Sequence, residues 1–175
     1  MNKNISVWQL IGFIFTVGGG VLLHFLYEWS NEARWAAPFS SVNESTWEHM
    51  KLLFIPALIF AFVQSLIFRD RKDFWNIKLK GILLGLILIP TLFYLYNGVI
   101  GESNDIVNIA IFVISVFVMF IYENKLFKTE KKDIKTSKYS LPVLLAIAIL
   151  FVVFTFKTPK IKIFEDPTTY TYGIK

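Results

Sequence analysis

The stretch ISVWQLIGFIFTVGGGVLLHFLY, from Ile5 to Tyr27, contains no lysine, arginine, aspartate or glutamate. A helix rises about 1.5 Å per residue, so roughly 20 apolar residues cross a hydrocarbon layer about 30 Å thick. This apolar run is longer than the core of a secretory signal, and no small-x-small cleavage site follows it. We therefore predict that the segment is a retained transmembrane helix.

Four further apolar stretches follow along the chain. They lack the alternation of barrel strands, and a backbone inside hydrocarbon must satisfy its own hydrogen bonds, so each stretch is expected to be helical. The sequence thus predicts an all-α integral membrane helix bundle over residues 1–156 and an extracytoplasmic C-terminal tail over residues 157–175. The predicted transmembrane segments are approximately 5–27, 47–68, 79–96, 106–122 and 139–156.

Composition narrows the chemistry that the chain can perform. Of its residues, 55% are hydrophobic and 18% are charged, which is typical of a chain surrounded mainly by lipid. The chain has no cysteine, which excludes disulfides and thiolate metal ligands. It also lacks a Walker lysine loop, a Gly-x-Ser-x-Gly elbow and a His-Glu-x-x-His motif, so phosphoryl transfer and nucleotide-driven pumping are not expected.

Basic residues in short loops predict the orientation, because cytoplasmic loops carry an excess of lysine and arginine. We expect the N-terminus inside and the C-terminus outside a bacterial cytoplasmic (inner) membrane. The net charge of +5 is then an orientation signal, and no nucleic-acid partner is expected. Lys157, Lys160 and Lys162 in the tail depart from the rule. The residues that set the orientation are Arg69, Arg71, Lys72 and Lys78 in one loop, and Lys125, Lys128, Lys131, Lys132, Lys135 and Lys138 in the other.

Gly81 and Gly85 form a small-xxx-small pair in the third predicted helix. Such a pair lets another helix approach closely. A homo-oligomer that forms through this face is therefore one expectation, with the lipid bilayer as the other partner of the chain.

Polar residues gather where the first and second predicted helices meet the exterior. His24 and Glu28 are four residues apart, which places them on one face of the first helix. The segment from Asn43 to His49 reads NESTWEH, and both histidines of the chain therefore lie close to the same loop. Ser45 and Glu48 have the spacing of a capping box at the start of the second helix.

This group contains the nitrogen and oxygen ligands that zinc, iron or manganese prefer. The ligand candidates are His24, Glu28, Glu44 and His49, and the supporting or capping residues are Asn43, Ser45 and Glu48. Two histidines with a carboxylate also suit acid and base catalysis without a metal. A divalent transition metal is the expected cofactor if the cluster is a binding site.

A structural interpretation of the same segment stays open. Trp29, Trp35 and Trp47 would anchor the helix ends at the membrane surface, with the charges solvated or paired with Arg34 and Lys51. In this interpretation the cluster only orders the outer loop.

Three strings carry a resemblance to a known family. They are LHFLYEWS from Leu23 to Ser30, VNESTWEHMKL from Val42 to Leu52, and FEDP from Phe164 to Pro167, with Tyr172-Gly173 near the end. Together they resemble the DUF6512 family of small bacterial multi-pass membrane proteins, whose function is unknown. The resemblance implies a bacterial membrane location and implies no activity.

Three functions fit these observations. The first is a membrane protein whose outward-facing His/Glu site binds a metal ion or a small polar or lipid ligand. The second is a non-enzymatic structural or accessory membrane protein. The third is a small transporter, for which Gln64 and Ser115 are the few polar residues within the membrane. The sequence does not decide whether the protein is an enzyme.

The orientation can be tested with single cysteines, because the chain has none of its own. Ser41→Cys and Thr169→Cys should react with an impermeant thiol reagent in intact cells, and Lys132→Cys should not. Labelling of Lys132→Cys alone would reverse the topology and place the polar cluster in the cytoplasm.

Overall fold

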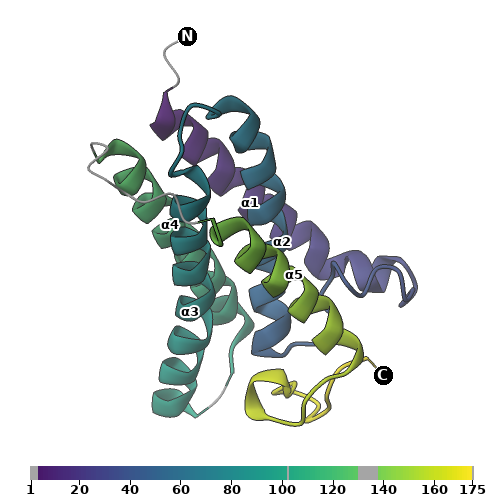
Figure 1. Cartoon of the computed structure of the whole chain (residues 1–175). Helices are drawn as coiled ribbons and strands as arrows, with labels where there is room; N and C mark the ends of the chain where they lie inside the picture. The colour runs from purple at the N-terminus through teal and green to yellow at the C-terminus, as the bar shows by residue number, and fades with distance from the viewer. Residues whose placement is uncertain (1–3, 102, 130–137, 175) are drawn as a thin grey trace.

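The computed structural model describes residues 4–101, 103–129 and 138–174, and over these residues the chain is all-α (Figure 1). An isolated antiparallel bridge between Glu165 and Tyr172 is the one extended pairing in this described part. The elements are α1 (Ile5–Trp29), α2 (Thr46–Ile67), α3 (Phe74–Ile100), α4 (Asp105–Lys128), α5 (Ser140–Phe156) and the 3₁₀ turn η1 (Lys162–Phe164).

Each of the helices α1 to α5 overlaps one predicted stretch, and the all-α architecture of the described residues confirms a membrane helix bundle. Helices α1 to α4 are long and apolar enough to cross a membrane, whereas α5 is a shorter apolar helix of 17 residues. At about 1.5 Å per residue α5 is about 26 Å long, slightly less than a typical hydrocarbon layer. Helix α3 begins at Phe74, before the predicted Leu79, and α4 ends at Lys128, beyond Tyr122, because helical hydrogen bonding continues into the polar flanks.

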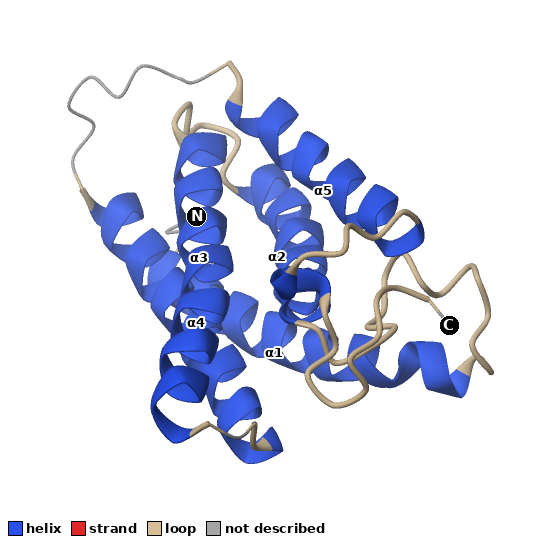
Figure 2. Cartoon of the chain, turned by 90° about the horizontal axis from the view of Figure 1, so that it is seen from below, coloured by secondary structure: helices blue, strands red, loops and turns tan. Residues whose placement is uncertain are grey.

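The helices pack so that the two ends of the bundle differ chemically. Helices α3 and α4 form an antiparallel pair, α1 packs on α2 and α4, and α5 packs on α3 and α2. The chain begins at one end of the bundle and finishes at the other (Figure 1). The loop over residues 68–73 lies at the first end, which we call the lysine end. The loop over residues 30–45 and the tail lie at the second end (Figure 2), which also holds His24 near the end of α1 and which we call the histidine end.

This arrangement agrees with an odd number of membrane crossings, while the side that each end faces stays a prediction. Lys131, Lys132 and Lys135 of the second basic loop lie outside the described residues. The sequence predicts that Lys78 lies in the first basic loop, and this prediction is wrong. The residue lies inside α3 and is fully buried.

Two glycines set the approach of α1 to α4. A Cβ atom at Gly12 would lie 2.5 Å from the ring of Phe120, and one at Gly20 would lie 2.5 Å from the ring of Phe112. Both distances are far below van der Waals contact, so a larger residue would displace the ring. The rings of Phe112 and Phe120 in α4 therefore occupy the space that a side chain at Gly20 or Gly12 would take.

The face with Gly81 and Gly85 does accept another helix, but that helix belongs to the same chain. A Cβ atom at Gly81 would meet the Glu123 side chain of α4, and one at Gly85 would lie 3.0 Å from Leu53 of α2. Both glycines are buried. This face is therefore already covered by helices of the same chain and is not open to a second copy of the protein. A homo-oligomer that forms elsewhere stays a prediction.

Lys51 is a buried cation that joins three parts of the histidine end. Its ammonium lies 2.5 Å from the Glu48 carboxylate and donates to the Ala37 carbonyl at 2.8 Å and to Thr155 Oγ1 at 2.9 Å. Neither Lys51 nor Glu48 is solvated, since their side chains are 0% and 3% exposed. The ammonium thus links α2, the preceding loop and α5.

The predicted capping box is half formed. Ser45 Oγ accepts from the Glu48 amide at 3.4 Å, as expected for an N-cap. The Ser45 amide, however, donates to Asn43 Oδ1 at 2.9 Å and not to Glu48. Glu48 is drawn away because Lys51 is the stronger partner for a buried carboxylate.

The loop over residues 30–45 folds back on α1. Ser40 Oγ accepts from the Tyr27 amide at 2.8 Å and donates to the Leu23 carbonyl. Ala36 and Ala37 are fully buried beside Tyr27, whereas Trp35 is 64% exposed. Small residues therefore make the close contacts, and Trp35 remains available to the membrane surface.

The tail docks on the histidine end through Asp166. This carboxylate accepts from the Glu44 amide at 3.3 Å, the Thr168 amide at 2.8 Å and the Thr169 amide at 3.1 Å. The Phe164 ring packs against the Trp47 ring in a tilted arrangement, with 4.7 Å between ring centroids. Burial alone would raise the pKa of the Asp166 carboxyl, but these hydrogen bonds outweigh it and hold the pKa below its ordinary value.

Ser41 is buried, so the cysteine test of topology is better placed at exposed Arg34 in the same loop. Arg34→Cys should be labelled wherever Thr169→Cys is labelled, because both positions lie at the histidine end. Labelling of one and not the other would contradict the described arrangement.

We predict that Lys51→Met destabilises the protein by about 3 to 5 kcal/mol, because it leaves the Glu48 carboxylate buried without its partner. The double variant Lys51→Met/Glu48→Leu should recover part of this loss. Thermal unfolding in detergent measures both. Lys72→Met, at an exposed position, is the control and should leave the melting temperature unchanged. Equal stability of Lys51→Met and wild type would contradict the buried linkage.

We also predict that tail docking weakens at acid pH. Because the folded pKa of Asp166 lies below its unfolded value, its contribution is present above the ordinary aspartate range and is lost as pH falls through the folded pKa. A spin label at Tyr170→Cys should therefore become more mobile at acid pH. In Asp166→Asn the label should lose most of this pH dependence, whereas in Glu165→Gln it should keep it. An unchanged label in the wild-type background would contradict the prediction.

Candidate metal centre

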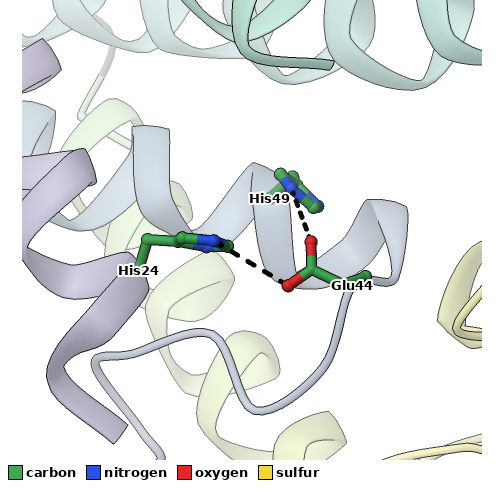
Figure 3. A group of neighbouring side chains, drawn as sticks. All are labelled: His24, Glu44 and His49. Atoms are coloured by element: carbon green, nitrogen blue, oxygen red, sulfur yellow. Dashed lines mark ion pairs between the residues drawn. The ribbon is translucent and has the colours of Figure 1, made fainter. Parts of the chain in front are cut away.

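Three side chains from separate segments meet at the histidine end. His24 lies near the end of α1, Glu44 lies in the loop just before α2, and His49 lies in the first turn of α2. One ligand atom from each lies within 4.8 Å of the others. The structure thus brings together three of the four ligand candidates, and Figure 3 shows the Glu44 carboxylate between the two imidazole rings.

The three residues converge without bonding tightly to one another. His24 Nε2 lies 3.8 Å from Glu44 Oε1, and His49 Nε2 lies 3.5 Å from Glu44 Oε2 (Figure 3). Both separations exceed an ordinary hydrogen bond. The ring centroids of the histidines are 5.9 Å apart. The donor atoms therefore surround a common point, as ligands do around an ion.

A backbone carbonyl determines the tautomer of His49. The Nδ1 atom lies 3.0 Å from the Ser45 carbonyl oxygen, which can only accept a hydrogen bond. Nδ1 must therefore carry the proton, and in the neutral ring Nε2 directs its lone pair toward Glu44. A carbonyl that orients the far nitrogen of a histidine is the usual support for a metal ligand. His24 differs, because its Nδ1 is buried and has no hydrogen-bond partner in the part of the chain that the structure describes.

An open cavity of about 270 Å³ borders the cluster. His24 and Glu44 form part of its wall, and Glu28 lies along the same wall outside the three-residue cluster. Glu28 follows His24 by one helical turn and is not among the three residues whose ligand atoms converge. The cavity walls also include Glu32, Ser41, Asn43 and Asp166.

The predicted supporting residues hold the loop that carries Glu44. Asn43 accepts from the Ser45 amide and donates from Nδ2 to the Gly173 carbonyl at 3.2 Å. Glu48 accepts from the Val42 amide at 3.2 Å in addition to its ion pair. None of these three side chains belongs to the cluster itself. They fix the backbone on both sides of Glu44.

Two contributors were not recognised in the sequence. The Asp166 carboxylate accepts a hydrogen bond from the Glu44 amide. The two residues are 122 positions apart, so no sequence spacing indicates that they are in contact. Lys51 was considered only as a surface partner for the carboxylates, although it anchors the loop from a buried position. A lysine three residues after a glutamate at a helix start was the available clue.

No curated protein and no solved structure matches the chain. A family model described as a family of unknown function, DUF6512, matches residues 1–174. That match covers the α1 and α2 segments, the loop between them and the tail residues that surround the cluster. The chain therefore belongs to the DUF6512 family.

Proposed function

We propose that this membrane protein binds a divalent transition-metal ion at the histidine end through His24, Glu44 and His49. The observation that carries the proposal is the convergence of three ligand atoms within 4.8 Å, with the tautomer of His49 set by a backbone carbonyl. Two imidazoles and one carboxylate form a ligand set that suits zinc, and also iron or manganese.

The charge of the adjoining cavity supports a cation over an anionic ligand. Glu28, Glu32, Glu44 and Asp166 border the cavity, and no lysine or arginine is among its described lining residues. A negatively charged lipid head group or phosphate would meet repulsion there. A metal ion would instead be favoured, and the cavity gives it a side on which a water molecule or small ligand completes the coordination.

The rival interpretation is that Glu44 only orders the loop by pairing with protonated histidines. Its side chain is 45% exposed, and its distances to both rings are long for a hydrogen bond. Exposed pairs of this kind contribute about 0 to 1 kcal/mol. The loop is held in any case by Lys51, Ser40 and Asp166, so the histidine pairs are not needed for that purpose.

The proposal is tested by metal analysis of protein purified without a histidine tag. Wild-type protein dialysed against zinc should retain metal near stoichiometry, and its melting temperature should rise with free zinc. His24→Ala, His49→Ala and Glu44→Gln should each lose most of the metal and most of this thermal shift. These changes remove ligands and leave the helix packing in place.

Glu32→Gln is the matched control, because Glu32 borders the same cavity but lies outside the cluster. It should retain metal like the wild type, and Glu28→Gln should reduce the metal content far less than Glu44→Gln. Metal-free wild-type protein, with the histidine variants as stable as wild type, would favour the accessory role. Loss of metal in Glu32→Gln to the same degree would show a diffuse acidic effect and no defined site.

A further inference from the structure

The bundle contains a second buried lysine–glutamate pair, and it differs from the first in how completely it is hydrogen bonded. At the histidine end, the Lys51 ammonium has three oxygen partners, and Glu48 accepts from Lys51 and from a backbone amide. That pair is satisfied in the way a structural ion pair must be. The hydrogen bonding of the second pair can therefore be compared with that of Lys51 and Glu48.

The second pair joins α3 and α4 near the lysine end. Lys78 Nζ lies 2.5 Å from Glu123 Oε2 and donates to Gln64 Oε1 of α2 at 2.9 Å. All three side chains are fully buried. The ammonium also lies 5.1 Å from the centroid of the Phe120 ring. Charged side chains within a membrane bundle are costly and commonly mark ion or proton sites.

Several polar atoms at the level of this pair, which we call the polar layer, have no hydrogen-bond partner among the described residues. Glu123 Oε1 is buried without a hydrogen bond, and so are both amide atoms of Gln9 in α1. Ser6 contacts Asn124 at 3.3 Å, and Gly12 faces Phe120, so the register places Gln9 at the level of Glu123. A carboxylate oxygen and a whole amide are therefore unsatisfied in one layer, where each costs about 1 to 3 kcal/mol.

Apolar side chains close the layer on both sides. Toward the lysine end, Phe68, Phe74 and Phe127 form a buried cluster one turn beyond the pair. Toward the histidine end, Ile82 and Met119 are buried one turn away in the other direction. The polar layer is thus enclosed, and Gly81 provides the space for the Glu123 side chain, since a Cβ atom there would overlap it.

We propose that Glu123, with Lys78, Gln64 and Gln9, forms an enclosed proton-binding site within the membrane. A proton from solvent adds to Glu123 Oε1, the carboxylate oxygen that has no hydrogen-bond partner among the described residues, and the carboxylate becomes a neutral carboxyl. The layer then gains one positive charge. That charge stays on Lys78, which keeps Gln64 Oε1 and the face of the Phe120 ring as partners.

The charge of Lys78 determines how readily Glu123 binds a proton, because the other helices that border the site contribute neutral side chains. Helix α1 contributes Gln9 and α2 contributes Gln64, both neutral, and Lys78 of α3 is the one charged group acting on Glu123 among the described residues. Protonation removes the ion pair between α3 and α4. The site therefore couples proton binding to the contact between these two helices, and it does so independently of the proposed metal centre.

The proposal is tested by NMR of protein labelled with ¹³C at the glutamate carboxyls, in phosphatidylcholine nanodiscs. The Glu123 signal, assigned as the one lost in Glu123→Gln, should move from the carboxylate to the carboxyl position as pH falls while the protein remains folded. The Glu48 signal, assigned with Glu48→Gln, is the buried control and should not move in that range. Gln9→Leu should shift the midpoint of the Glu123 titration, because it removes the polar side chain that α1 contributes at the level of Glu123.

Two results would overturn the proposal. One is a Glu123 signal that stays at the carboxylate position throughout the folded range, which would make the pair structural like Lys51–Glu48. The other is a Glu123 signal that moves only together with Glu48 as the fold is lost. If Glu123→Gln does not fold, Gln9→Leu still identifies the signal, since it retains both charges of the pair and changes the α1 side chain at the level of Glu123.

Discussion

The ammonium of Lys51 is the interaction on which the histidine end depends. A lysine without solvent must find oxygen partners, and here these come from α2, from the loop that follows α1, and from α5. The loop is thereby held close to the start of α2. Glu44 reaches the two histidines because the chain on its N-terminal side is fastened at Ala37 and Ser40.

A second constraint comes from the tail, which closes the other side of the same loop. The Asp166 carboxylate accepts a hydrogen bond from the Glu44 amide, and the Gly173 carbonyl accepts one from Asn43 Nδ2. Residues from the first third of the chain and from its last part therefore meet in one small region. The ligand atoms lie on segments that are each fixed by buried or backbone hydrogen bonds, as a preorganised site requires.

The fold was largely predictable because apolar length in a membrane protein is a strong signal. The helix positions follow from the lengths of the apolar runs. His24 and His49 lie on either side of the loop that carries Glu44, which was the available signal for their proximity, whereas the four-residue spacing indicated Glu28, which stays outside the cluster. Lys78, Glu123 and Lys51 were not recognised as buried, because a charge near the end of an apolar run reads as a surface residue. Only the packing of neighbouring helices reveals that such a charge is enclosed, and no spacing along one chain encodes a partner such as Asp166.

The unequal burial of the helices carries a mechanical consequence. In α1, 17% of the most apolar window is buried inside the protein, compared with 50% in α2. His24 thus belongs to the wall of the bundle that touches lipid most, whereas His49 belongs to its most enclosed helix. A change in bilayer thickness that altered the tilt of α1 would therefore change the separation of the two imidazoles, and the lipid would act on the cluster through one helix.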